Sequence, residues 1–167
     1  MPTIDQAFTW LIALPPLALY AIAFGLALFE NIFPPFPADV FIGLCAFIAA
    51  RGNHPLAVMI VAVVGGNLSG AVLMYTVGRR YGAAGLHARM EAKGMIRREE
   101  RLESMYQRYG LAALFIGRLV PGIRGIVPLV AGAFRIRAIP ALTVIAIAST
   151  AWYSALVVLA FRVGNDW

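Results

Sequence analysis

The chain has few charged residues and very few side chains suited to catalysis. Only 13% of its 167 residues are Asp, Glu, Lys or Arg, and it contains two histidines and one cysteine. The lone cysteine, Cys45, excludes a disulfide within the chain, and two histidines leave little material for a metal centre or a histidine-based acid–base pair. We therefore expect no metal, no cofactor and no enzymatic activity.

Hydrophobic residues make up 61% of the chain, and the mean hydropathy is +0.80. A soluble domain of this length cannot bury that much apolar surface, so residues 1–167 are predicted to form a single membrane domain. The net charge of +6 would suggest nucleic acid for a soluble protein. Here basic loops beside apolar segments reflect the positive-inside rule and anionic lipid headgroups, and we expect no nucleic-acid partner.

Two uncharged apolar stretches are long enough to cross a bilayer. Leu56–Gly78 ends at Arg79, and Ala138–Phe161 ends at Arg162. A helix of about 20 apolar residues spans roughly 30 Å of hydrocarbon. Both stretches are therefore predicted to be transmembrane helices.

Two other apolar stretches are interrupted at their centres by residues that break helices. Tyr109–Phe134 is too short for two crossings of about 20 residues each. Pro15–Ala50 has the same plan, although its longer arms leave the depth of its tip open. Proline removes a backbone donor and glycine weakens a helix, so each stretch is predicted to be a re-entrant helical hairpin. The breaks are Pro34, Pro35 and Pro37 in the first hairpin, and Pro121, Gly122 and Pro128 in the second.

The order hairpin, span, linker, hairpin, span predicts an all-α integral membrane protein built from an inverted repeat. Repeat one covers about residues 15–78, the linker 79–108, and repeat two about 109–161. One span separates the two hairpins, so they would enter the membrane from opposite faces. Broken helices that meet at the midplane of such repeats are a recurring plan among transporters.

The linker is rich in basic residues and carries apolar residues at helical spacing. It contains eight basic and four acidic residues, which together with this spacing predicts an amphipathic helix on the membrane surface. With Arg135 and Arg137 it places ten basic residues on one side, against Arg51 and Arg162 on the other. The positive-inside rule then makes the linker cytoplasmic and puts both termini outside.

Four charged residues lie inside the two broken stretches. Glu30 and Asp39 flank the first break, and Arg118 and Arg124 flank the second. An ionised group in hydrocarbon costs about 3 kcal/mol or more, so such residues usually face a cavity or a partner. Arginine binds phosphate oxygens through a planar fork, and a carboxyl group beside it can exchange a proton. We interpret the arginines as substrate-binding and the acids as proton-coupling residues.

Several alternatives stay open for the polar residues of these segments. The four charges can instead pair only to permit folding, with no ligand. Asn67, in the glycine-rich segment Gly65–Gly70, either lines the cavity as a substrate-binding residue or supports helix packing through small residues. Trp152 and Tyr153 are expected to pack or to anchor the helix, and not to form a binding cage.

Three segments resemble motifs of the DedA family, also called the VTT or SNARE-associated-domain family. Glu30–Asp39 resembles its acidic and proline signature, Gly66–Gly82 its second-helix pattern, and Phe115–Gly132 its second signature. The motifs occur in the family's order, and the resemblance covers about residues 17–161. It implies a bacterial inner-membrane protein with two re-entrant hairpins. The family's essential acids and arginines map onto Glu30, Asp39, Arg118 and Arg124.

The resemblance also implies a function. Family members are implicated in moving lipids across bilayers, including the polyprenyl-phosphate carrier of cell-wall synthesis, and in proton-dependent transport. We therefore expect a transporter, flippase or scramblase of anionic lipids such as undecaprenyl phosphate or phospholipids. Its partners would be these lipids and protons, with proton coupling and a homo-oligomer left open. The alternatives are a proton-coupled carrier of a small ion and a non-transporting membrane assembly factor.

Overall fold

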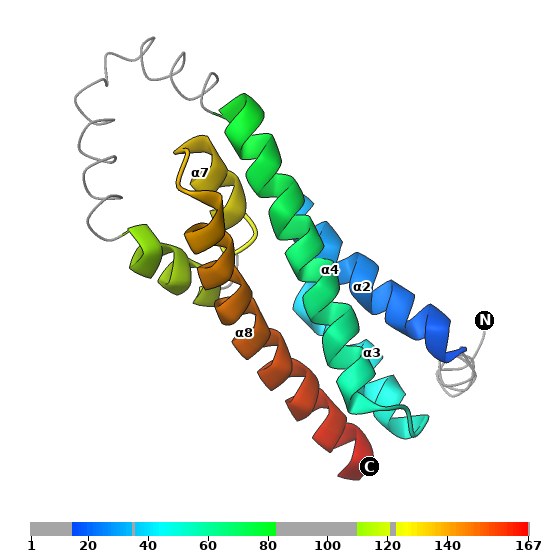
Figure 1. Ribbon diagram of the computed structural model, residues 1–167. Coiled ribbons are helices and arrows are strands. Elements are labelled where there is room, and N and C mark those ends of the chain that lie inside the picture. Colours follow the sequence, from blue (N-terminus) through cyan, green and yellow to red (C-terminus); the bar gives the residue numbers. More distant parts are fainter. Residues whose placement is uncertain (1–14, 35, 83–109, 121–122, 167) are drawn as a thin grey trace.

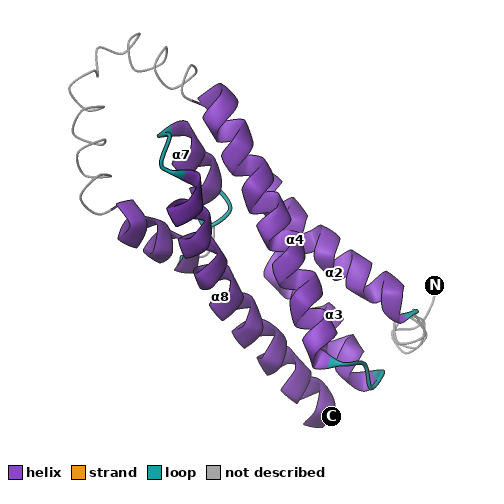
Figure 2. Ribbon diagram, viewed as in Figure 1, coloured by secondary structure: helices purple, strands orange, loops and turns teal. Residues whose placement is uncertain are grey.

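The computed structural model describes residues 15–34, 36–82, 110–120 and 123–166, and all regular structure in these residues is helical (Figures 1 and 2). The predicted all-α class is thus confirmed for this part of the chain. The predicted linker helix falls almost entirely outside the described residues. The helices are α2 (Pro16–Ile32), α3 (Ala38–Arg51), α4 (Leu56–Val77), η1 (Gly78–Gly82), an unlabelled helix (Gly110–Leu119), α7 (Val127–Ala133) and α8 (Ala138–Asp166).

Two helices are long and apolar enough to cross a membrane, and both start where the sequence predicts a span. α4 continues through the π-helical turn η1 to give an unbroken helix of 27 residues, and α8 has 29 residues. At 1.5 Å per residue each is about 40 Å long. α8 runs past the predicted end at Phe161 to Asp166. The extra turn carries Arg162 and Asp166, so the helix extends beyond its apolar segment.

Each of these long helices leaves most of its residues partly or fully exposed. In the most apolar window of either helix, only 33% of the residues are buried. In α4, Val61 is 71% exposed, and in α8, Ile139 and Leu159 are 82% and 64% exposed. A contiguous exposed apolar surface of this kind needs a partner or lipid to cover it. The packing is therefore compatible with a protein embedded in a lipid bilayer.

α2 and α3 form a helical hairpin and lie side by side (Figure 1). Pro16 occupies the first turn of α2, where the missing N–H costs nothing because that donor has no partner inside the helix. The chain turns back between Ile32 and Ala38, and Pro34 and Pro37 lie in this turn. Pro35 lies outside the described residues.

The second half contains a shorter hairpin. The helix Gly110–Leu119 is followed by a turn that includes residues 123–126, and α7 then leads back (Figure 1). Pro128 is in the first turn of α7, so it starts this helix after the break instead of lying within it. Pro121 and Gly122 lie outside the described residues.

Close backbone contact joins α4 to α2 at two glycines one turn apart. A Cβ atom at Gly66 would lie 2.1 Å from the carbonyl oxygen of Phe24, and one at Gly70 would lie 2.6 Å from that of Leu28. Glycines four residues apart share one helix face and let two helices approach closely. Asn67, next to Gly66, is thereby held against α2.

The second hairpin packs on α4, and the first packs on α8. A Cβ atom at Gly132 of α7 would lie 2.0 Å from the carbonyl oxygen of Tyr75 in α4. One at Gly164 of α8 would lie 2.8 Å from the carbonyl oxygen of Phe47 in α3. Each hairpin therefore contacts the long helix of the other half as well as its own.

The two hairpins end in the same local conformation. Asn53 follows α3 with φ 54° and Arg135 follows α7 with φ 53°, both in the left-handed region. The next amide then donates back across the helix end, from His54 to the carbonyl of Ala49 at 2.9 Å and from Ile136 to that of Ala131 at 3.1 Å. This is the left-handed cap that commonly terminates α-helices.

Candidate functional site

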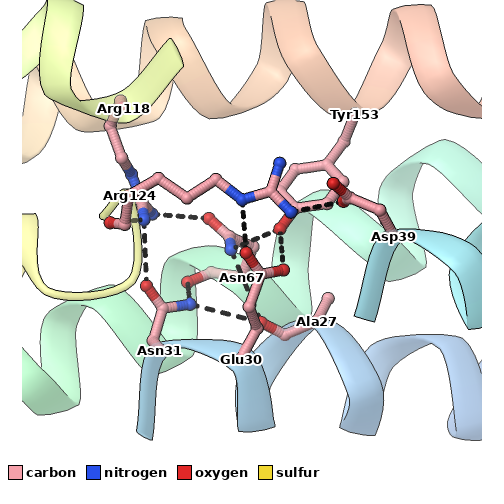
Figure 3. A network of polar contacts seen from close by, with 8 residues as sticks. All are labelled: Ala27, Glu30, Asn31, Asp39, Asn67, Arg118, Arg124 and Tyr153. Atoms are coloured by element: carbon pink, nitrogen blue, oxygen red, sulfur yellow. Dashed lines mark hydrogen bonds and ion pairs between the residues drawn. The ribbon is translucent and has the colours of Figure 1, made fainter. Parts of the chain in front are cut away.

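A network of polar side chains forms where the two hairpin turns meet the middle of the long helices (Figure 3). Every member except Asp39 is buried, and the Asp39 side chain is 28% exposed. The members are Glu30 and Asn31 near the end of α2, Asp39 in the first turn of α3, Asn67 in α4, Arg118 near the end of the Gly110–Leu119 helix, Arg124 in the turn before α7, and Tyr153 in α8.

Arg124 binds both acidic residues of the network. Its Nε donates to Oε1 of Glu30, and its Nη2 forms an ion pair with Oδ1 of Asp39. The centre of its guanidinium group also lies 5.2 Å from the ring of Trp152 and 5.4 Å from the ring of Tyr153. The loop that carries Arg124 is thus connected to α2, α3 and α8 through one side chain.

Arg118 is held by neutral oxygens. Its Nη1 donates to Oδ1 of Asn31 at 3.0 Å and to the backbone oxygen of Arg124 at 2.7 Å, and its Nη2 donates to Oδ1 of Asn67 at 2.7 Å. Within the described part of the chain, no carboxylate directly contacts this guanidinium. Arg118 is 3% exposed, so it places a positive charge inside the protein without an ion-pair partner of its own.

The amides and the tyrosine hydroxyl orient these groups. Tyr153 donates its hydroxyl hydrogen to Oε2 of Glu30 at 2.6 Å and accepts a hydrogen bond from Nδ2 of Asn67 at 3.1 Å. Nδ2 of Asn31 donates to the backbone oxygens of Ala27 and Asn67, both at 3.2 Å. Because their amide nitrogens are engaged in this way, the oxygens of Asn31 and Asn67 face Arg118.

Two arginine donors in the network lack a partner. Among the described residues, neither Nε of Arg118 nor Nη1 of Arg124 has a hydrogen-bond acceptor, although both atoms are buried. Leaving a buried donor unpaired costs about 1–3 kcal/mol, and folded proteins pair nearly all such groups. These two donors therefore have no acceptor among the described residues, and an anion with several oxygens would supply one.

The predicted site residues come together in the structure. Glu30, Asp39, Arg118, Arg124 and Asn67 all belong to one network, while the roles assigned to them remain predictions. Asn67 contacts Arg118 and lies beside the close-packed Gly66, and its predicted substrate-binding role stays a prediction. The acids pair with an arginine, as the folding-only alternative requires, but both pair with the same one.

Two members of the network were missed by the sequence analysis. Tyr153 was predicted only to pack or to anchor α8, yet its hydroxyl binds Glu30. A buried tyrosine hydroxyl needs a hydrogen-bond partner, so its position midway along an apolar span was an available signal. Asn31 directly follows Glu30 in an apolar helix, and a polar residue at such a position was likewise a signal for the site.

Comparison with known proteins gives a family match and several distant relatives. A family model described as the VTT domain matches residues 36–161. An alkaline phosphatase-like protein of Lactococcus lactis subsp. lactis (strain IL1403) is 27% identical over 154 residues, which cover 89% of this chain and 72% of that protein. Undecaprenyl phosphate transporter A of Staphylococcus aureus (strain NCTC 8325 / PS 47) is 21% identical over 145 residues, which cover 84% of this chain and 71% of that protein. No solved structure gives a significant match.

Proposed function

Because the chain belongs to the VTT-domain family, the DedA family that its motifs resemble, we propose that it transports lipids with phosphate headgroups across a membrane. The distant relative whose name identifies it as an undecaprenyl phosphate transporter makes a polyprenyl phosphate one candidate substrate. We further propose that the protein is a multi-pass protein of a bacterial inner membrane and transports its substrate without chemical conversion.

The observation that carries this proposal is the buried network at the hairpin turns. Two arginines lie there with unpaired N–H donors, beside acids from another segment of the chain. A guanidinium group matches the geometry of phosphate oxygens and keeps its charge at every accessible pH. A phosphate bound by Nε of Arg118 and Nη1 of Arg124 would satisfy two donors that have no acceptor among the described residues.

Charge balance in the network favours coupling to protons. The formal charges of Glu30, Asp39, Arg118 and Arg124 sum to zero, so a bound phosphate would leave an excess negative charge in a buried site. Such excess charge is costly, and protonation of one carboxylate removes it. Protonation would also release Arg124 from that acid. We propose that one proton accompanies each monoanionic headgroup and that Arg118, held by neutral groups, attracts the phosphate throughout.

The arrangement of the helices supports re-entrant hairpins within an inverted repeat. The hairpin arms have 17 and 14 residues in the first half, and in the second half the described residues form the Gly110–Leu119 helix and the seven-residue α7. At 1.5 Å per residue the described parts of these arms are about 10–26 Å long, less than the roughly 30 Å of the hydrocarbon core. Residues at both turns contact Asn67 and Tyr153, which lie far from either end of α4 and α8. The turns would then lie near the midplane.

Two of the contacts between helices correspond in the two halves, which supports a repeat. α4 contacts α7, and correspondingly α8 contacts α3, while the caps at Asn53 and Arg135 are alike. We propose that the halves are related by a two-fold axis in the membrane plane, with the linker cytoplasmic. Single cysteines in a Cys45→Ala background test this topology. Arg51→Cys should react with a membrane-impermeant maleimide only from outside and Tyr81→Cys only from inside, and labelling of both from one side would refute it.

Reconstitution into liposomes tests the transport itself. The purified protein should move a labelled polyprenyl phosphate between leaflets, and Arg118→Ala should abolish this movement. Arg162→Ala, which removes an exposed arginine at the far end of α8, serves as the matched control and should transport normally. Movement of inorganic phosphate but not of the lipid would instead favour the small-ion carrier. Absence of all transport by the folded native protein would favour the assembly factor.

A further inference from the structure

Two unpaired donors on α8 lie outside the network described above. Ser149 is 3% exposed and its Oγ has no hydrogen-bond partner among the described residues. Nε1 of Trp152 is likewise buried and without an acceptor in that part of the chain. The two residues are three positions apart, so they share one face of the helix. The neighbouring Tyr153 hydroxyl, in contrast, both donates and accepts.

Trp152 lies directly against the polar network. The centre of the Arg124 guanidinium group is 5.2 Å from its ring, and Nη1 of this guanidinium has no acceptor among the residues that the structure describes. The ring therefore gives α8 an aromatic contact with Arg124, and its N–H adds a donor that this contact does not use. Ser149 extends the same face by one turn.

The chemistry of these donors restricts the ligand that can bind them. An indole N–H can only donate, and the guanidinium beside it can only donate, so neither can satisfy the other. Both need an acceptor from outside the side chains that surround them. A phosphate group presents several acceptor oxygens, more than Nε of Arg118 and Nη1 of Arg124 alone can occupy.

We infer that Trp152 and Ser149 form a second side of the headgroup site, in which the Trp152 indole N–H and the Ser149 hydroxyl donate to the phosphate oxygens bound by the arginines. This inference rests on the proposed function and adds α8 residues that no motif identified. α8 would thus help to set the preference for headgroups with more free phosphate oxygens. A monoester has three such oxygens and a diester has two, so the monoester would benefit more.

Removal of the indole N–H with the aromatic contact retained tests the inference. Trp152→Phe keeps a ring against Arg124 and deletes the donor. A donor to a charged acceptor is expected to raise affinity by about tenfold or more, so this variant should bind a short-chain prenyl monophosphate about tenfold more weakly. Ser149→Ala should weaken binding in the same direction with a smaller structural change. For a diester analogue, the loss should be smaller in both variants.

Tyr20→Phe is the matched control. The Tyr20 hydroxyl is also buried and unpaired, but the ring lies on α2 next to His54, and the network does not involve it. Its removal should leave the affinity unchanged. Inorganic phosphate as a second probe shows whether the lipid chain is needed, because a site for free phosphate would bind it with comparable affinity.

Fluorescence gives a readout that does not depend on a change at Trp152. The chain has three tryptophans, so Trp10→Phe with Trp167→Phe leaves Trp152 as the only tryptophan. Its emission should shift when the prenyl monophosphate is added, and not with an uncharged prenyl alcohol. No binding to the native protein would refute the proposed function. Binding that shifts no emission and is equally tight in Trp152→Phe, Ser149→Ala and Tyr20→Phe would refute this inference alone.

Discussion

Tyr153→Phe removes one hydroxyl from the centre of the network and leaves its ring in place. The ring contact with Arg124 at 5.4 Å is retained. What is lost is the 2.6 Å hydrogen bond to Glu30 and the acceptor for Nδ2 of Asn67. Nδ2 of Asn67 still donates to the backbone oxygen of Ala27 at 3.4 Å. The Glu30 carboxylate therefore loses more hydrogen bonding than Asn67 does.

The magnitude follows from these two hydrogen bonds. A hydrogen bond to a charged group contributes about 1.5–3 kcal/mol and a neutral one about 0.5–1.5 kcal/mol. Because the Asn67 amide keeps its other hydrogen bond, we expect the free energy of unfolding to fall by about 2–3 kcal/mol.

The assay is thermal unfolding in detergent. Tyr81→Phe is the control, because its ring is 66% exposed in η1, away from the network. A Tyr153→Phe protein as stable as Tyr81→Phe would show that the hydroxyl does not stabilise the network, and its assigned hydrogen bond to Glu30 would be wrong.

Two further predictions concern the arginine and the helix packing. Arg118→Lys should lower transport at least about tenfold in the liposome assay. An ammonium group lacks the planar fork of donors that lets arginine bind Asn31, Asn67 and a phosphate together. Arg162→Lys is the control and should have no effect. Gly66→Ala should destabilise the protein by several kcal/mol in thermal unfolding, because its Cβ would lie 2.1 Å from the backbone oxygen of Phe24. Gly25→Ala, whose Cβ meets nothing within 4 Å, should instead be neutral or stabilising by up to about 1 kcal/mol. Equal effects of the two glycine changes would contradict the close contact of α2 with α4.

The sequence was sufficient to locate the elements because hydrophobicity and helix breakers act locally. The spans that start at Leu56 and Ala138 appear as helices of the expected kind, and the turn at Pro34 separates two helices. The four charges were recognisable because an ionised residue is rare in an apolar segment. The same residues lie in a single network, as their cost in hydrocarbon predicts.

The pairing within the network was not predictable from the sequence. Nothing in the spacing of Glu30 and Asp39 indicates that Arg124 binds both acids while Arg118 binds amide oxygens. That choice depends on how α4 and α8 are placed, since Asn67 and Tyr153 supply the remaining partners from distant segments. The contribution of Asn31 is of the same kind, because its role is defined only by the approach of Arg118.

The proton-to-lipid ratio is the measurement that tests the central claim most directly. In liposomes that contain a pH indicator, transport of a labelled monoanionic phosphodiester lipid should be accompanied by movement of about one proton per lipid. Glu30→Gln and Asp39→Asn should each reduce both fluxes together. Lipid movement without any proton movement, unchanged in both amide variants, would contradict the account and leave the buried network as a purely structural element.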